Sequence, residues 1–316
     1  MTTRITSPFN WSSTAAEVAV GHDLSGKRAI ITGATSGLGL ETARVLASCG
    51  VEVVLTGRDM AAVAPLIAEI TASGGKAHGM AMDLTDLRSV EAFAAAEGGA
   101  PLHLLINNAG VMACPLGRTK QGFEMQLGVN HLAHFHLTKL LLPALKAAGG
   151  ARVVALSSSG HHWGQVDFDD PNFERREYDP LVSYGQAKSA NALFAVELDR
   201  RCRADGIRAF SLMPGGIQTN LGRYMTDDVR SRLGVDPEGA KNIRWKTVEQ
   251  GSATTVWAAI GRELEGTGGL YLEDVNEAVP SKEGMHNGVK PWAIDPVLAE
   301  RLWVWSEAAI ARAGTQ

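Results

Sequence analysis

A tyrosine and a lysine stand four residues apart, at Tyr184 and Lys188, in a segment that predicts a helix reaching about Arg203. Residues with this spacing share one face of a helix. A lysine ammonium beside a phenol favours tyrosinate and lowers the pKa of the tyrosine from its usual value of about 10. The pair could therefore transfer protons as a general acid and base. Because the same spacing is common in purely structural helices, the surrounding sequence has to decide between the two interpretations.

Three consecutive serines precede this pair. The apolar run Ala151–Leu156 predicts a buried strand, and Ser157, Ser158 and Ser159 follow it directly. The carboxyl end of a strand is where open α/β sheets bind their ligands. A serine hydroxyl at that position could hold a carbonyl oxygen beside the phenol of Tyr184.

A glycine-rich turn follows the first predicted strand. The apolar run Arg28–Thr32 predicts that strand, and Glu41–Ser48 continues as a helix. Between them, Gly33, Gly37 and Gly39 would let the backbone turn tightly and approach a pyrophosphate closely. The following helix N-terminus would offer unpaired N–H groups to the phosphates. Such glycines also mark ordinary tight turns, and their G-x-x-x-G-x-G spacing differs from the common G-x-G-x-x-G dinucleotide fingerprint.

The end of the second predicted strand bears on the choice of cofactor. This strand, Val51–Thr56, is followed by Gly57 and Arg58, with no acidic residue. An acid here would bind the ribose 2′-hydroxyl of NAD, whereas an arginine suits the 2′-phosphate of NADP. The sequence therefore favours NADP(H) over NAD(H), with a solvated loop charge as the alternative interpretation of Arg58.

With four further segments, these motifs resemble the short-chain dehydrogenase/reductase family, and the finer pattern is similar to its retinol dehydrogenase-like group. The resemblance extends from about Leu24 to about Glu307. The further segments are Asp83-Leu84, Asn107-Asn108-Ala109-Gly110, Gly128-Val129-Asn130-His131, and Pro214-Gly215 followed by Thr219. Together with Arg58, the resemblance implies that the cofactor is bound by Gly33, Thr35, Ser36, Gly37, Leu38, Gly39, Asp83, Leu84, Asn107, Ala109, Gly110, Tyr184, Lys188, Pro214, Gly215, Ile217 and Thr219.

The resemblance also implies a mechanism of direct hydride transfer at the nicotinamide. In that mechanism Tyr184 protonates the forming alkoxide, or removes the alcohol proton in reverse. Lys188 lowers the pKa of the phenol and binds the nicotinamide ribose, Ser158 orients the substrate oxygen, and Asn130 helps to hold a water that links Lys188 to solvent. No metal is needed, because the phenol and the serine stabilise the developing charge.

The order of the predicted elements indicates an α/β fold. Strands and helices alternate from Lys27 to about Leu272 without a linker or a repeat. We expect a single Rossmann-type domain over residues 24–316, with a doubly wound parallel sheet flanked by helices. Residues 1–23 form an N-terminal extension in this interpretation, and the resemblance places a variable substrate lid near residues 216–246.

Composition limits the other classes of function. The net charge is −4 and the basic residues do not cluster, so a nucleic-acid partner is not expected. Three cysteines without a C-x-x-C pattern predict a reducing, cytoplasmic location. No signal peptide and no membrane anchor is expected, because no stretch approaches about 18 uncharged apolar residues. Tryptophans in the C-terminal part could line a substrate cleft or a subunit interface, which leaves a homo-oligomer open.

Histidines near the predicted catalytic residues raise two further questions. His131, His134 and His136 follow Asn130 at a spacing that could converge on a metal. No nearby acid or cysteine completes a ligand set, so we expect packing roles and no metal. His161 and His162 follow the serines, where they could contact the substrate or only shape the loop.

The sequence therefore predicts an NADP(H)-dependent carbonyl reductase or alcohol dehydrogenase that acts on a lipophilic ketone, aldehyde or secondary alcohol. Apolar side chains in the lid would cover such a substrate: Leu221, Tyr224, Met225 and Trp245. Arg223 and Arg244 are the counter-argument, because either could turn inward and bind an anion. Two alternatives remain, a catalytically silent nucleotide-binding regulator and a sugar-nucleotide epimerase of the extended branch of the family.

Overall fold

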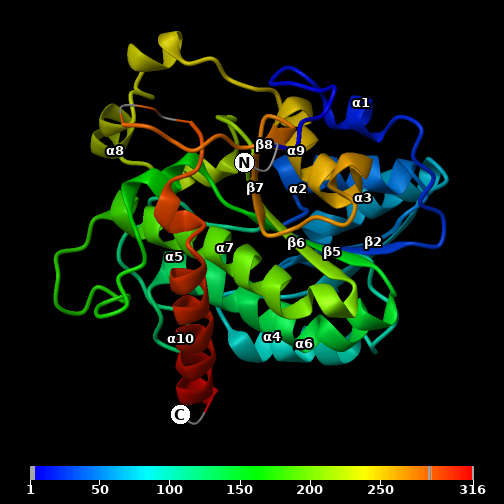
Figure 1. Ribbon diagram of the computed structural model, residues 1–316, viewed down its shortest axis with the longest axis horizontal. Helices are drawn as coiled ribbons and strands as arrows, with labels where there is room; N and C mark the ends of the chain where they lie inside the picture. The colour runs from blue at the N-terminus through cyan, green and yellow to red at the C-terminus, as the bar shows by residue number, and fades with distance from the viewer. Residues whose placement is uncertain (1–3, 284, 286, 315–316) are drawn as a thin grey trace.

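A twisted sheet forms the centre of the computed structural model, which describes residues 4–283, 285 and 287–314. Within these residues the sheet has eight strands, in the order β3-β2-β1-β4-β5-β6-β7-β8. Helices cover both of its faces (Figure 1). The strands are β1 (Arg28–Thr32), β2 (Glu52–Gly57), β3 (Lys76–Ala81), β4 (Leu104–Asn107), β5 (Ala151–Leu156), β6 (Ile207–Met213), β7 (Leu270–Glu273) and β8 (Asn276–Glu277).

All neighbouring pairs from β3 to β7 are parallel, whereas β8 is antiparallel to β7. The antiparallel edge follows from the connection, because only two residues, Asp274 and Val275, separate the two strands. Both have positive φ, 50° and 60°, as the tightest type of hairpin turn requires. The predicted parallel sheet is confirmed, with this short hairpin as an addition at its edge.

Alternate residues of the strands pack against two separate layers of helices. In β1, Ala29 and Ile31 belong to the core beneath α1, α2, α3 and α9, whereas Ile30 belongs to the core beneath α4, α6 and α7. Strands buried on both faces in this way need continuous apolar runs. The helices are α1 (Ala15–Ala19), α2 (Gly37–Ser48), α3 (Met60–Ala72), α4 (Leu87–Ala96), α6 (Ala133–Ala147), α7 (Pro180–Cys202) and α9 (Val248–Ile260).

The C-terminal helix α10 (Pro296–Gly314) packs across α7 and completes the second layer (Figure 1). Its Trp303 is buried against Phe135 of α6 and Phe194 of α7, at ring centroid distances of 4.8 Å and 6.2 Å. Two shorter helices, α5 (Met125–Leu127) and α8 (Asp227–Arg232), lie in the connections at one edge of the sheet.

The N-terminal segment packs on the layer of helices that contains α2, α3 and α9. Helix α1 contacts α9, and Ala15, Val18 and Ala19 are buried in the same core as β1. Upstream of α1, the Ile5 amide donates to Glu277 of β8, 2.8 Å from Oε2. The described part of the predicted extension therefore shares its hydrophobic core with the sheet.

The strand order reverses between β1 and β4, the two strands from which the sheet grows in opposite directions. In doubly wound folds, ligands bind outside the carboxyl ends of the strands at such a switch point. The glycine turn follows β1, the Asn107–Gly110 segment ends β4, and the serines follow β5. The fold therefore brings the predicted motifs to one edge of the sheet.

Candidate active site

The turn after β1 has the backbone that its glycines predict. Gly33 and Gly37 have φ of 67° and 58°, which side chains other than glycine rarely adopt. At Gly39, a β-carbon would stand 2.5 Å from the Gly33 carbonyl oxygen and 2.5 Å from Nδ2 of Asn108. A larger residue at position 39 would therefore displace the turn or the segment after β4. The side chain of Leu38, between the last two glycines, is apolar and packs against the same hydrophobic core as Ala29 and Ile31.

The N-terminus of α2 fits a phosphate group. Its capping residue, Ser36, is exposed and extended and makes no side-chain hydrogen bond to the helix. The first turn of α2 therefore keeps its amide groups for another acceptor. Next to this turn, Thr35 lies close to the end of β2, because a β-carbon on Gly57 would be 3.0 Å from its Cγ2 atom. Arg58 follows Gly57 and is exposed. The glycine turn and Arg58 thus border the same surface.

A hydrogen-bond network ties the glycine turn to the segment after β4. The hydroxyl of Thr32 accepts the amides of Asn108 and Ala109, both at 2.9 Å. It also lies 2.8 Å from Nε2 of His134. The side-chain amide of Asn108 donates to the Thr32 carbonyl at 2.7 Å. Sequence reasoning identified neither Thr32 nor Asn108 as a residue that joins two motifs, because these bonds span more than 70 residues.

Three predicted cofactor residues are held mainly by the protein. The Asp83 carboxylate accepts the amide and the hydroxyl of Thr85, both at 2.9 Å, and Leu84 is buried. The side chain of Asn107 is also buried and donates to Thr138 of α6 at 3.2 Å. These contacts place Asn107 inside the second layer of helices, behind the edge that Ala109 and Gly110 reach.

The segment after β6 closes over the glycine turn. A β-carbon on Gly37 would meet Cγ2 of Thr219 at 3.4 Å, so the two predicted motifs are in contact. Ile217 and Leu38 both approach Gly251 of α9. Pro214 leads into Gly215, whose φ is 109°. Lys246, which sequence reasoning missed, fills the space beside Gly215 and pairs with Asp274 at 2.6 Å.

The phenol ring of Tyr184 and the hydroxyl of Ser158 both lie next to Gly160. The ring of Tyr184 contacts Gly160, because a β-carbon there would stand 2.7 Å from its Cε1 atom, and Tyr184 is only 2% exposed. The Ser158 hydroxyl also accepts the Gly160 amide at 3.0 Å, which fixes its direction. Ser157 is turned away, since its hydroxyl donates to the Lys188 carbonyl at 2.8 Å. Of these two serines, Ser158 is the one whose hydroxyl affects the pKa of the phenol.

The pKa of Tyr184 differs from the expected direction. Burial raises it to about 12, and the nearby Ser158 hydroxyl offsets only part of that rise. The expectation that Lys188 lowers this pKa is therefore wrong for this structure. The physical reason is twofold: Lys188 Nζ is 5.5 Å from the ring centroid, and burial lowers the pKa of Lys188 itself to about 7. At neutral pH the phenol is protonated, which is the form that donates a proton.

Lys188 and Asn130 converge on Gly110. A β-carbon on Gly110 would be 3.0 Å from Asn130 Oδ1 and 3.8 Å from Lys188 Nζ. The ammonium donates to the Leu156 carbonyl at 2.8 Å, and Lys188 is 4% exposed. Asn130 is fully buried and exchanges two hydrogen bonds with the Val111 backbone, at 2.8 Å and 2.9 Å. All four predicted catalytic side chains therefore border one small region at the carboxyl edge of the sheet.

Asn130 lies in a π-helical turn, Gly128–Leu132, which precedes α6. Such turns widen a helix locally and often mark functional positions. Here the Asn130 carbonyl accepts Nδ1–H of His134 at 3.0 Å. Burial lowers the pKa of His134 to about 4, so the ring is neutral at pH 7. Its Nε2 can then accept the Thr32 hydroxyl, which links this turn to β1.

The other histidines have protein partners. His131 Nε2 lies 2.9 Å from the Ser306 hydroxyl of α10, and His136 Nε2 lies 3.0 Å from Glu91. His161 is fully buried beneath the serines, and His162 Nε2 lies 3.0 Å from the Gly288 carbonyl. The structure therefore places His161 inside the protein, where it does not face a substrate.

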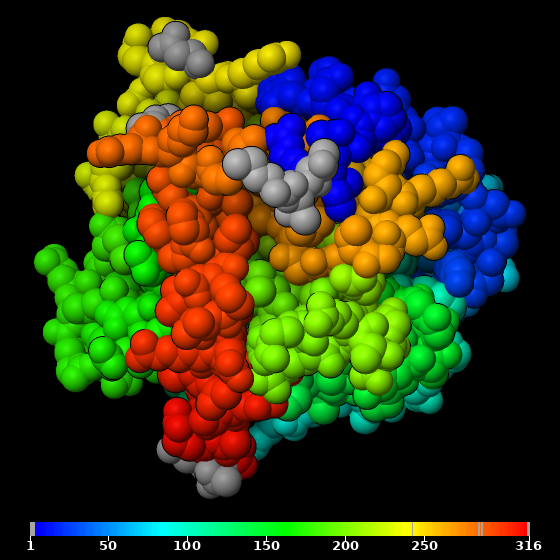
Figure 2. All heavy atoms as spheres, in the orientation of Figure 1, coloured from blue at the N-terminus to red at the C-terminus, as the bar shows by residue number. Residues whose placement is uncertain are grey.

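The predicted lid region joins the site through an apolar cluster. Met225 and Val229 pack with Met112, Ala113 and Leu181, which belong to the segments after β4 and at the start of α7. Figure 2 shows this region, in yellow, beside the orange segment that leads into α10.

Both lid arginines lie over aromatic rings at the surface of the protein. Arg223 lies over the ring of Tyr224 at 4.6 Å, and Arg244 lies over Trp11 at 3.7 Å. Both are exposed. Arg244 therefore joins the lid to the N-terminal segment through a cation–π contact.

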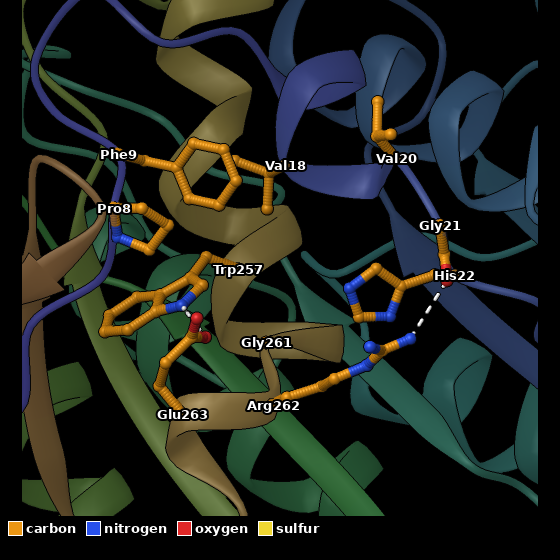
Figure 3. A pocket seen from close by; sticks show the side chains of 10 residues that line it. All are labelled: Pro8, Phe9, Val18, Val20, Gly21, His22, Trp257, Gly261, Arg262 and Glu263. Carbon is orange, nitrogen blue, oxygen red and sulfur yellow. Dashed lines mark hydrogen bonds between the residues drawn. The ribbon is translucent and has the colours of Figure 1, made fainter.

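A separate hollow of about 200 Å³ lies between the N-terminal segment and the end of α9 (Figure 3). Trp257 Nε1 donates to Glu263 at 3.0 Å, and Arg262 donates to the Gly21 carbonyl at 2.9 Å. The lining residues of the N-terminal segment precede β1 in the chain, and those from Trp257 to Glu263 precede β7. The hollow is therefore at the amino ends of the strands, opposite the edge that holds Tyr184.

The family model for short chain dehydrogenase matches residues 27–230 of this chain. The chain belongs to the short-chain dehydrogenase/reductase family. It is a dehydrogenase or reductase of that family, whose cofactor is NAD(P). The matched range contains the glycine turn, Asn130, Ser158 and the Tyr184–Lys188 pair.

Several relatives are similar over most of their length. A Streptomyces lividans protein named only as an oxidoreductase is 46% identical, covering 89% of this chain and 96% of the relative. Mouse polyprenol dehydrogenase is 42% identical (88% and 82% covered), and human retinol dehydrogenase 13 is 38% identical (90% and 84% covered). These relatives confirm the resemblance to the retinol dehydrogenase-like group.

Solved structures show the same fold. A crystal structure of an uncharacterised Mycobacterium paratuberculosis protein is 33% identical, with a TM-score of 0.74 and coverage of 96% of this chain and 98% of the other. A gluconate 5-dehydrogenase structure from Beutenbergia cavernae, described as NAD(P)-dependent and with bound NADP, is 25% identical. Its TM-score is 0.63, with 79% and 96% covered. In the described part of this chain, no helix is long and apolar enough to cross a membrane.

Proposed function

We propose that this enzyme reduces an apolar ketone or aldehyde with NADPH, and oxidises the corresponding alcohol in the reverse direction. The observation that carries the proposal is that the Ser158 hydroxyl and the buried phenol ring of Tyr184 both lie against Gly160, with Lys188 and Asn130 at neighbouring Gly110. A protonated phenol next to a second hydroxyl can bind a carbonyl oxygen from two directions. Both groups then stabilise the negative charge that develops on that oxygen.

The reaction follows from these side chains. When bound, the nicotinamide supplies the hydride in reduction and accepts it in oxidation. Ser158 holds the substrate oxygen, and Tyr184 donates its proton to that oxygen as the alkoxide forms. Lys188 holds the nicotinamide ribose, and its pKa of about 7 lets it return a proton to Tyr184 near neutral pH. Asn130 holds the π-helical turn against the segment after β4 through its two hydrogen bonds to the Val111 backbone.

The apolar character of the substrate rests on the apolar cluster between the lid region and the start of the helix that carries Tyr184. Met112, Met225 and Leu181 supply apolar surface from three different segments. Trp163 adds an aromatic group that sequence reasoning missed: its ring centroid is 6.1 Å from that of Tyr184, and it is still 36% exposed. Burying such surface against a substrate stabilises the complex by about 25 cal/mol per Å². The stacking of Arg223 and Arg244 on aromatic rings supports the same conclusion.

The preference for NADP(H) rests on Arg58. It is exposed, it follows β2 directly, and it borders the surface that Thr35 shares with the end of that strand. A guanidinium at this position can bind a 2′-phosphate with two hydrogen bonds. The bound NADP in the Beutenbergia cavernae structure supports this choice of cofactor.

The two alternatives have less support. A silent regulator would not need Ser158, Tyr184, Lys188 and Asn130 together at one buried site. An epimerase acting on a sugar nucleotide would need polar partners for the sugar, whereas the cluster between the lid region, the segment after β4 and the start of α7 consists of apolar side chains such as Met112, Met225 and Leu181.

A substrate panel tests the proposal. Ketones, aldehydes and secondary alcohols would be assayed with NADPH, NADP, NADH and NAD, including a matched series of apolar ketones and their carboxylated analogues. We expect the highest kcat/KM for an apolar ketone or aldehyde with NADPH. Better turnover of the carboxylated compounds, lost in Arg223→Ala or Arg244→Ala, would show instead that the lid is an anion clamp.

A further inference from the structure

The backbone carbonyl of Ser158 accepts an unusual number of hydrogen bonds. The His161 amide donates to it at 3.1 Å, as expected in a tight turn. Nδ1 of the His161 ring lies 2.6 Å from the same oxygen, and the Tyr271 hydroxyl donates to it at 3.1 Å. Three donors from two parts of the chain therefore converge on one peptide group, whose own residue carries the hydroxyl that meets Tyr184.

The protonation of His161 is defined by its partners. Nε2 accepts the Lys290 amide at 3.1 Å, so this nitrogen carries no proton. Nδ1 carries the proton and donates it to the Ser158 carbonyl. Burial lowers the pKa of His161 to about 4, so the neutral ring persists at physiological pH. The ring is fully buried and packs edge-on against His162, with centroids 4.4 Å apart. It therefore holds one orientation.

Tyr271 reaches this carbonyl from the neighbouring part of the sheet. It is a residue of β7, is 3% exposed, and its hydroxyl also lies 3.2 Å from His161 Nδ1. Lys290, on the other side of His161, belongs to the segment that leads into α10. The Ser158 turn is thus fastened to two C-terminal elements that contribute no group to the reaction itself.

We propose that His161 and Tyr271 are positioning residues that fix the Ser158 peptide, and through it aim the Ser158 hydroxyl at the Tyr184 phenol. Without them, the turn that begins at Ser158 would be free to rotate its first peptide. The hydroxyl would then spend less time at the substrate oxygen. This inference rests on the proposed role of Ser158 in carbonyl reduction.

A double-mutant cycle tests the role of Tyr271. Tyr271→Phe removes only the hydroxyl, and we expect kcat to fall about tenfold while KM for NADPH stays unchanged. In a Ser158→Ala background the same substitution should change kcat by less than about twofold, because no hydroxyl remains to be aimed. A general loss of stability would instead lower kcat equally in both backgrounds, and that result would overturn the proposal.

A second pair of variants tests His161. In His161→Asn the side-chain amide can replace Nδ1–H as a donor to Ser158, whereas His161→Gln places its amide nearer the position of Nε2. We expect the His161→Asn variant to retain several-fold more of the wild-type kcat than the His161→Gln variant. Equal losses in the two variants would contradict the proposal.

Tyr178→Phe is the matched control. The Tyr178 hydroxyl donates to the Cys114 carbonyl at 2.9 Å and does not contact Ser158. We expect Tyr178→Phe to lower kcat by the same factor in the Ser158→Ala and wild-type backgrounds. Absence of turnover in the wild-type enzyme with every carbonyl compound would refute the proposed function, whereas an active wild type with an unaffected Tyr271→Phe would refute only the positioning role.

Discussion

The backbone of Gly160 lies directly against the ring of Tyr184: a β-carbon at position 160 would stand 2.7 Å from the Cε1 atom of the phenol. That β-carbon would also be 3.1 Å from the Trp163 ring. The Gly160 amide also holds the Ser158 hydroxyl, at 3.0 Å. The close approach of Ser158 to Tyr184 therefore depends on a residue without a side chain two positions downstream.

The substitution Gly160→Ala should lower kcat by at least about tenfold, because the new methyl group must push the turn and the phenol apart. Real β-carbons do not approach atoms this closely, so either Tyr184 or Ser158 has to move. Gly150→Ala is the control, since a β-carbon there meets nothing within 4 Å. Steady-state kinetics on both variants would check this, and wild-type turnover in Gly160→Ala would show that the turn is not a tight spacer.

Replacing Arg58 tests the cofactor choice. In Arg58→Ala, NADPH should bind about tenfold or more weakly because a charge-assisted phosphate contact is lost, whereas NADH binding should change little. Fluorescence titration with both cofactors measures the two affinities. Equal losses, or a wild-type preference for NADH, would contradict the assignment of Arg58 to the 2′-phosphate.

The sequence predicts the strand ends that carry the motifs well, because each motif follows a short apolar run. The strand Arg28–Thr32 and the strand Ala151–Leu156 have the predicted bounds. Since parallel strands share one carboxyl edge, the order of the motifs is enough to bring Gly33 and Ser158 to the same edge.

What the sequence does not predict are contacts made across long separations. Tyr271 reaches Ser158 from 113 residues away. The raised pKa of Tyr184 has the same kind of origin. The four-residue spacing from Lys188 suggested a lowered pKa, but the complete burial of the phenol, which no local pattern reveals, has the larger effect.

Buried histidines should make the enzyme sensitive to mild acid. Burial lowers the pKa of His131 to about 3, and those of His134 and His161 to about 4. In the unfolded chain these rings take up protons below pH 6.5, whereas in the fold they stay neutral. The unfolded state thus binds more protons, and stability is lost as the pH falls from 6.5 towards 4. The expected loss is about 1.4 kcal/mol per pH unit for each histidine.

Urea unfolding between pH 7 and pH 5 measures this loss of stability. The variant His131→Gln lacks one of the three titrating rings, so its free energy of unfolding should fall less steeply with pH than that of the wild type. The same slope in both proteins would mean that His131 does not take up a proton on unfolding.

Tyr184→Phe tests the central claim most directly. The substitution keeps the buried ring and removes the hydroxyl whose proton the account assigns to the substrate oxygen. We predict that NADPH oxidation with the best ketone of the panel falls by about 10²–10⁴-fold, while NADPH binds with unchanged affinity. Turnover within a few-fold of the wild type would contradict the assignment of Tyr184 as the general acid and base.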